Sequence, residues 1–119
     1  MSEKRRKIYA IDFDGTIVED KWPEIGEEKK ETTDFIRAIQ DLGCQWVLWT
    51  CRTDENLNEA LEFCLHHGLY PNAVNEGVHP RTLTGEWEPA KVFADTYIDD
   101  KASGGLIIPS IPKSPFAHE

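Results

Sequence analysis

The sequence lacks any apolar run long enough to cross a membrane, since no stretch approaches the roughly 20 residues that a spanning helix needs. The start, residues 1–7, is polar and basic. The apolar run behind it, residues 8–11, is too short for the core of a secretory signal and leads into Asp12 and Asp14. We therefore expect a cytoplasmic protein without a membrane partner.

Cysteine is scarce and unpaired in sequence. The three cysteines, Cys44, Cys51 and Cys64, are odd in number and form no C-x-x-C pair. This argues against a disulfide framework and against a structural zinc site. We interpret them as small, mostly buried thiols in a reducing compartment.

Positive charge is in deficit, with 13 Lys and Arg against 22 Asp and Glu, for a net charge of −9. A general nucleic-acid binder usually carries a basic face, so this composition argues against nucleic acid as a partner. Net charge hides local geometry, however. Carboxylates gathered around a cation would count as acid and still attract phosphate.

The 119 residues are enough for one domain with one core, and they show no internal repeat or linker. Apolar runs predict buried strands, and apolar residues at helical spacing predict two helices between them. The predicted strands are residues 7–11, 45–50, 73–75 and 93–98, with a short edge strand at 106–108. The predicted helices start at Thr32 or Thr33 and at Thr53 or Asp54. Residues 19–30 predict a loop or small flap, and 75–89 mostly loop.

Strands that alternate with helices predict an α/β fold with a mainly parallel sheet and right-handed crossovers. Ligands of such sheets bind beyond the carboxyl ends of the strands. Three predicted strands end in polar residues: Asp12 with Asp14, Thr50, and Asp99 with Asp100. Taken alone, the first pair fits a strand cap and turn equally well. Four carboxylates at one sheet edge would repel each other unless a cation compensates, and Mg²⁺ is the natural one.

The run Asp12-Phe13-Asp14-Gly15-Thr16, then Thr50, Lys91 and Asp99-Asp100, resembles the four motifs of the haloacid-dehalogenase superfamily. Those enzymes are mostly phosphatases, and the resemblance covers about residues 7–103. It implies a Rossmann-like three-layer α/β/α domain over residues 1–119, with residues 1–6 and 109–119 as loose termini or an extended arm. Neither 19–30 nor the loop after Asn75 is long enough for a separate cap domain.

The resemblance also implies roles. Asp12 would be the nucleophile that forms an aspartyl-phosphate. Asp14 would be the general acid and then the base, and its backbone carbonyl would bind the Mg²⁺ together with Asp12. Thr50 would hydrogen-bond a phosphoryl oxygen. Lys91 would hold the nucleophile and the phosphate by its charge.

Several assignments stay open at this point. Lys91 lies only eight positions before Asp99, which leaves little room for the usual helix, so Arg52 and Arg81 compete as the phosphate-holding cation. Arg52 would contact substrate or simply enter the second helix as a charge. Asp100 aligns best with the direct metal ligand and Asp99 with a supporting position, although either could be the ligand. A tryptophan in the flap, Trp22, would stack on a substrate or pack on the body.

Three functions remain in competition. The first is a Mg²⁺-dependent phosphohydrolase acting on a small phosphorylated molecule. The second is a non-catalytic module that binds Mg²⁺ or a phospho-ligand with the same pocket. The third is a phosphotransfer receiver domain, in which the phosphorylated Asp would be expected where Thr50 stands. Capless members of the superfamily often act on bulky substrates or borrow a neighbouring subunit as a lid, and the second alternative would make this protein a homo-oligomer.

Overall fold

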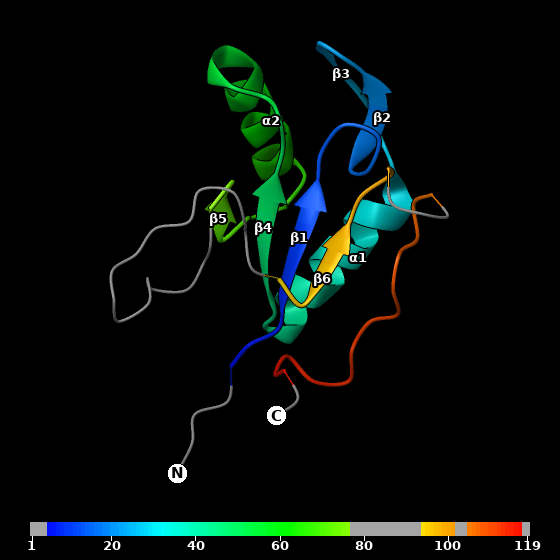
Figure 1. Ribbon diagram of the computed structural model, residues 1–119, viewed down its shortest axis with the longest axis vertical. Helices are drawn as coiled ribbons and strands as arrows, with labels where there is room; N and C mark the ends of the chain where they lie inside the picture. The colour runs from blue at the N-terminus through cyan, green and yellow to red at the C-terminus, as the bar shows by residue number, and fades with distance from the viewer. Residues whose placement is uncertain (1–4, 77–93, 102–104, 118–119) are drawn as a thin grey trace.

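A parallel sheet of four strands forms the centre of the molecule (Figure 1). The structure is a computed structural model that describes residues 5–76, 94–101 and 105–117. The strands, in spatial order, are β5 (Ala73–Val74), β4 (Gln45–Trp49), β1 (Ile8–Asp12) and β6 (Thr96–Ile98). All four were predicted from apolar runs, with boundaries that differ by a few residues. The α/β class and the parallel sheet are therefore confirmed.

The strand order places β1 at a switch in direction. The chain passes from β1 to its neighbour β4 and on to β5, and it later returns to β6 on the other side of β1. Neighbouring crossovers that leave a strand in opposite directions open a crevice at its carboxyl end, where ligands of such sheets bind. Asp12 is the last residue of β1 and lies at this crevice.

Two helices pack against one face of the sheet, α1 (Lys30–Leu42) and α2 (Asp54–His66). The ring of Tyr9 on β1 meets Phe35 of α1 edge-on at 5.3 Å, and Phe13 meets Phe63 of α2 at 5.8 Å. Because side chains alternate along a strand, the opposite face carries Ile8, which belongs to a separate and smaller cluster. Among the described residues both helices lie on one side, so the third layer of the predicted α/β/α arrangement stays a prediction.

Within the described ranges, no helix combines the length and the apolarity that membrane crossing requires.

The predicted start of the first helix, at Thr32 or Thr33, is late, because the helix begins at Lys30. The predicted stop at Gly43 is confirmed. Gly43 adopts φ 104° at the helix end, and its N–H donates to the carbonyls of Ile39 and Gln40. The predicted thiols are all free: Cys44 and Cys64 are buried, whereas Cys51 is exposed.

The segment predicted as a loop or flap is an antiparallel hairpin, β2 (Val18–Lys21) paired with β3 (Glu24–Glu28). Figure 1 shows it standing beyond the carboxyl ends of the central strands, beside the beginning of α2. Its charged composition hid the strands, because the hairpin has little buried surface and thus no apolar alternation. The hairpin is the element that can wall a site at this end of the sheet.

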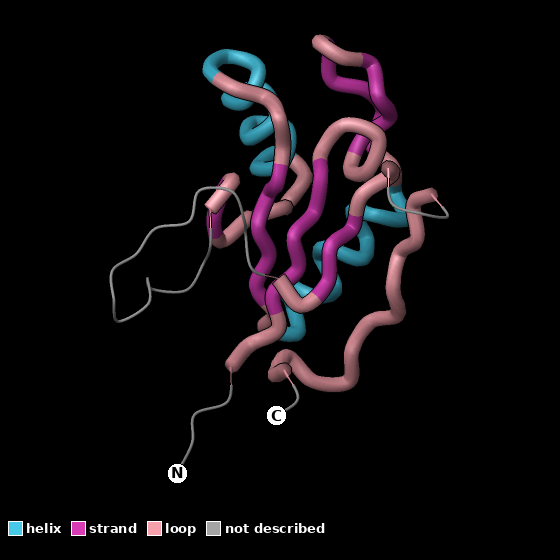
Figure 2. Tube along the Cα trace, viewed as in Figure 1, coloured by secondary structure: helices cyan, strands magenta, loops and turns pink. Residues whose placement is uncertain are grey.

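The C-terminal segment runs back as loop from the carboxyl end of the sheet to the amino end (Figure 2). The strand predicted at 106–108 is wrong, because these residues form no ladder; Leu106 and Ile108 instead pack against the main core. Of the two alternatives for the C-terminal tail, the last described residues agree with an extended arm packed on the body and not with a loose end. The Lys7 N–H donates to the Pro115 carbonyl at 2.6 Å, and the Ala117 N–H donates to the Arg5 carbonyl at 2.7 Å.

Candidate active site

Three aspartates converge at the carboxyl end of the sheet. Asp12 ends β1, while Asp99 and Asp100 follow β6, which is the parallel neighbour of β1. One carboxylate oxygen from each can be chosen so that all three lie within 4.8 Å of one another. The sequence predicted that four carboxylates, those of Asp12, Asp14, Asp99 and Asp100, would meet here, because parallel neighbours bring their carboxyl ends to the same edge. The structure groups three of them, without Asp14.

The electrostatics of this cluster are unfavourable without a cation. Burial first, and then the charges of Asp99 and Asp100, raise the pKa of Asp12 from 3.8 to about 7. The N–H of Phe13 hydrogen-bonds Asp12 and opposes this rise. Burial, and then the contact with Asp99, also raises the pKa of Asp100. A bound cation would remove the repulsion.

The donors fit a hard divalent cation. The Oδ1 atom of Asp100 is buried and has no hydrogen-bond partner, which is costly for a carboxylate oxygen unless an ion or water satisfies it. The loop after β1 approaches this side chain closely. A Cβ on Gly15, which has φ +84°, would lie 2.2 Å from Asp100 Oδ2. The N–H of Asp100 also donates to Thr16 Oγ1 at 3.0 Å. Carboxylate oxygens in such a cradle are the ligands that Mg²⁺ prefers.

Thr50 lies beside the cluster, directly after β4. Its N–H donates to Asn75 Oδ1 at 2.8 Å, and its hydroxyl oxygen accepts the Arg52 N–H at 3.1 Å. A cavity of about 320 Å³ is lined by Thr50 and by Asp12 of the cluster, whereas Asp99 and Asp100 do not line it. The residues around the cavity come from β1, the hairpin and the loops after β4 and β6: Asp12, Asp14, Asp20, Trp22, Thr50, Cys51, Arg52 and Lys101.

Asp14 lines the same cavity, but its carboxylate belongs to an ion pair. Arg52 donates from Nε to Asp14 Oδ2 at 2.8 Å and from Nη2 to Asp14 Oδ1 at 2.7 Å. The Arg52 side chain is 1% exposed and the Asp14 side chain 21%. The sequence predicted that Arg52 contacts substrate. In the structure its guanidinium instead points to Asp14 and donates to both of its carboxylate oxygens. The backbone carbonyl of Asp14 as a metal ligand stays a prediction.

The sequence offers Lys91, Arg52 and Arg81 as the cation that holds the phosphate. Lys91, the first choice from the sequence, and its competitor Arg81 both lie outside the described residues. The structure instead brings Lys101 to the cavity, next to Asp100 in sequence. We missed it because a lysine after two aspartates reads as part of a polar turn. Its position directly behind the acidic pair was the signal that could have found it.

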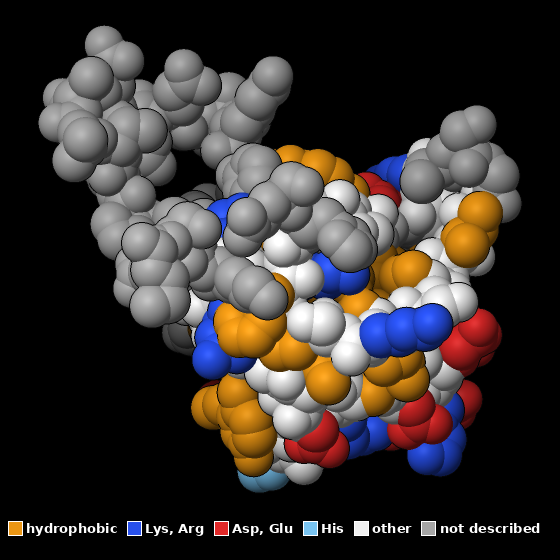
Figure 3. All heavy atoms as spheres, turned by 90° about the horizontal axis from the view of Figure 1, so that it is seen from below, with side chains coloured by type: hydrophobic (Ala, Val, Ile, Leu, Met, Phe, Trp, Pro, Cys, Tyr) orange, Lys and Arg blue, Asp and Glu red, His pale blue; other side chains and the backbone are white. Residues whose placement is uncertain are grey.

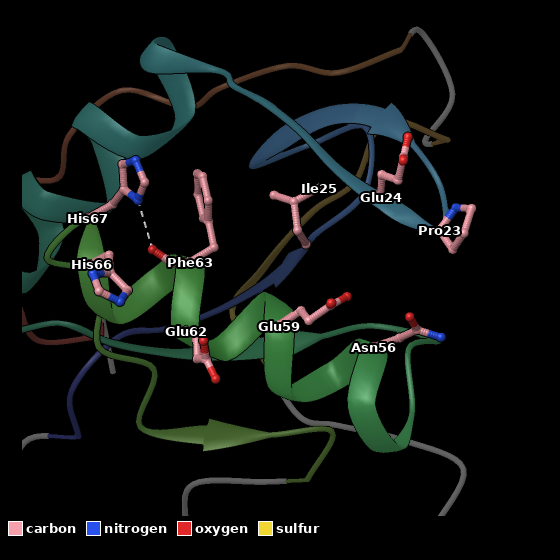
Figure 4. Close-up of a pocket in the computed structure, with 9 residues that line it drawn as sticks. All are labelled: Pro23, Glu24, Ile25, Asn56, Glu59, Glu62, Phe63, His66 and His67. Carbon is pink, nitrogen blue, oxygen red and sulfur yellow. Dashed lines mark hydrogen bonds between the residues drawn. The ribbon is translucent and has the colours of Figure 1, made fainter.

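A second hollow, of about 640 Å³, lies between the hairpin and α2 (Figure 4). Phe63 and Ile25 face each other across it, and acidic side chains such as Glu59 and Glu62 stand along the helix. The ring of His67 stacks on Phe63 at 3.9 Å, and its Nδ1 lies 2.8 Å from the Phe63 carbonyl. None of the side chains predicted to do chemistry lines this hollow.

The fold and the site define an α/β protein with an acidic cavity at the switch point of a parallel sheet. A solved structure of a conserved protein from Bacteroides thetaiotaomicron is 38% identical in sequence, covers 89% of this chain and 84% of its own, and superposes with a TM-score of 0.74. The chain belongs to the same family as that conserved Bacteroides protein. No protein-family model matches the chain, and no curated protein matches it.

Proposed function

We propose that the protein is a Mg²⁺-dependent phosphohydrolase of the haloacid-dehalogenase type, built on a Rossmann-like three-layer domain. The observation that carries this proposal is the convergence of Asp12, Asp99 and Asp100 at the switch point, where Asp100 keeps a buried oxygen without a partner. A structural role does not account for three acids in this position, because their repulsion opposes folding. A metal site accounts for them, because a bound cation would compensate that repulsion.

The residues that would hold the ion are Asp12 and Asp100, with Asp99 beside them and the backbone carbonyl of Asp14 as a further ligand. The unpartnered Oδ1 favours Asp100 as the direct ligand, because Asp99 Oδ1 already accepts the Lys101 N–H at 2.9 Å. When bound, Mg²⁺ would neutralise the charge between an anionic nucleophile and an anionic phosphate.

The chain's own side chains divide the reaction between them. An Asp12 oxygen attacks phosphorus and the bond to the leaving oxygen breaks, while Asp14 gives that oxygen its proton. Thr50 holds a phosphoryl oxygen with its hydroxyl, and a cation balances charge, either Lys101 of the cavity or Lys91, which lies outside the described residues. Asp14 then takes a proton from water, which hydrolyses the aspartyl-phosphate and releases inorganic phosphate. The cavity of about 320 Å³ suits a small phosphate monoester.

One observation favours a second candidate, a module that binds Mg²⁺ or a phospho-ligand without turnover. Both Asp14 oxygens accept hydrogen bonds from Arg52, so the proposed acid is held in an ion pair. A binding module has no need of a free acid at that position. Metal-dependent turnover decides between the two candidates.

The test is turnover of p-nitrophenyl phosphate and a panel of phosphate esters, with Mg²⁺ and with EDTA. We expect hydrolysis that requires the metal, and we expect Asp12→Asn to lower kcat on the order of 10⁴-fold or more while the far-UV circular dichroism stays unchanged. Asp41→Asn is the matched control, because Asp41 is exposed near the end of α1 and far from the cluster. Metal binding without turnover of any ester would favour the binding module.

A further inference from the structure

Arg52 is a buried cation whose five N–H groups are all engaged. Besides its two bonds to Asp14, it donates from Nη1 to the Pro23 carbonyl at 3.1 Å and from Nη2 to the Glu24 carbonyl at 3.1 Å. A longer bond of 3.4 Å runs from Nη1 to the Asn56 carbonyl in α2. One side chain thus joins the loop after β1, the turn of the hairpin and the first turns of α2.

Two aromatic rings fix the plane of this guanidinium. Its Cζ lies 5.2 Å from the centre of the Phe13 ring and 4.9 Å from the centre of the Trp22 ring. A flat cation is attracted to ring faces, so these contacts add to the orientation that the hydrogen bonds impose. Phe13 is fully buried, whereas Trp22 is 55% exposed and lines the cavity.

The exposures of the two ion-pair partners differ in a way that separates their roles. Both residues line the cavity, but the Arg52 side chain is 1% exposed and its N–H groups are already engaged, whereas the Asp14 side chain is 21% exposed. A carboxylate offers about four acceptor sites, so two hydrogen bonds from Arg52 leave one on each oxygen. Asp14 can therefore meet a substrate oxygen while Arg52 still holds it.

We propose that Arg52 is a positioning residue that fixes the Asp14 carboxylate and links it to the hairpin turn; this proposal rests on the proposed function. The acid–base group and the hairpin wall of the cavity, which carries Trp22, thus form one unit. A buried ion pair alone would be weak evidence, because such pairs often stabilise little. This pair, however, connects two parts of the site. The carboxylate that Arg52 holds is the one assigned to proton transfer, and Arg52 also donates to the carbonyl of Pro23 in the hairpin turn and to that of Glu24 at the start of β3.

The kinetic test compares two leaving groups in wild-type protein and Arg52→Lys. Lysine keeps the charge but cannot make the paired contact to a carboxylate. An alkyl phosphate needs a proton from Asp14 as it leaves, whereas p-nitrophenolate leaves with little help. We expect kcat on the alkyl phosphate to fall roughly 100-fold and kcat on p-nitrophenyl phosphate less than about 3-fold, with KM nearly unchanged for both.

Other kinetic outcomes overturn the proposal. A rise in KM for both esters, with kcat kept, would make Arg52 a substrate-binding residue. An equal fall in kcat for both, matched by a loss of folded protein in the circular dichroism, would make it merely structural. Arg5→Lys is the matched control, since it removes a paired Arg–carboxylate contact with Asp95 at the amino end of the sheet, away from the cavity, and the ratio of the two kcat values should stay within about 3-fold of wild type.

A second measurement does not depend on turnover. Amide hydrogen exchange of residues 18–28 should be faster in Arg52→Lys than in wild-type protein, because the hairpin turn loses two hydrogen bonds. Unchanged exchange would overturn the coupling to the hairpin, whether or not the protein hydrolyses phosphate. Faster exchange in a protein whose wild type hydrolyses neither ester would mean that the proposed function has failed and the catalytic role of Arg52 with it, while the coupling holds.

Discussion

Asp95, at the amino end of the sheet, and Asp12, at the carboxyl end, have opposite surroundings. Arg5 donates to both Asp95 oxygens, at 2.9 and 2.7 Å, and the Ile8 N–H donates to Oδ2 at 2.8 Å. These partners, the Arg5 hydrogen bond first, hold the pKa of Asp95 below its usual range. Asp12 has other aspartates for neighbours, and its pKa rises to about 7 through burial first. The comparison separates charge that holds the fold together from charge that opposes it.

The amino end is also where the two ends of the chain meet. Arg6 donates to the Gly43 carbonyl at 2.8 Å and lies 5.3 Å from the centre of the Phe116 ring. Figure 3 looks onto this end from below and shows Lys and Arg side chains between hydrophobic ones. Arg5 and Arg6 at this end bind structural partners, whereas at the other end three carboxylates lie close to one another. Repulsion between carboxylates opposes folding, so a structural region avoids it, whereas a binding site retains it.

The largest expected difference between the two ends is in pH dependence without metal. The folded pKa of Asp12 is about 7 and its usual value 3.8, so its stabilising proton is fully present below about pH 4 and is lost as the pH rises through 7. We expect the free energy of unfolding in EDTA to fall between pH 5 and pH 8, and to fall less in Asp12→Asn. At pH 8 the variant should be more stable on the order of a few kcal/mol.

Urea denaturation at both pH values measures this difference. Asp95→Asn is the control, because the pKa of Asp95 is lowered and the group does not titrate between pH 5 and pH 8. Parallel pH slopes for wild type and Asp12→Asn would show that the cluster carries no unfavourable charge.

The next effect is stabilisation by the metal. An ion that binds only the folded protein stabilises it by about 2.7 kcal/mol at 100 times its Kd. We expect Mg²⁺ to raise the thermal unfolding temperature of wild-type protein at pH 8, and Asp100→Asn to lose most of that rise. Asp41→Asn should keep it. A rise of equal size in Asp100→Asn would move the metal away from this cluster.

The smallest effect is at the amino end. Asp95→Asn removes a paired, charge-assisted contact that is about a quarter exposed, so we expect a loss of roughly 1 kcal/mol in the free energy of unfolding at pH 7. The pKa of Asp95 is lowered, so its contribution is present above its usual pKa and is lost as the pH falls through the folded value. The difference between wild type and variant should therefore shrink in acid. A constant difference from pH 7 to pH 2 would contradict this account.

Prediction from the sequence succeeded where apolar pattern and strand ends carry the information. The central strands are continuous apolar runs, so they and the aspartates behind them were recognisable. The hairpin was missed because its side chains are charged and exposed. The strand at 106–108 was wrong because an apolar stretch can pack on a core without joining a sheet.

The sequence by itself determined which residues meet at the carboxyl edge, because parallel strands align their ends whatever the details of packing. It therefore predicted that Asp12, Asp14, Asp99 and Asp100 would meet, and three of them, without Asp14, do so. Only the tertiary structure decided how Asp14 is used. The partner of Asp14 is 38 residues away in the chain, and the hairpin carbonyls that hold this partner belong to a segment without sequence signal. Long-range hydrogen bonds leave no local pattern, so contacts of this kind appear only in the folded chain.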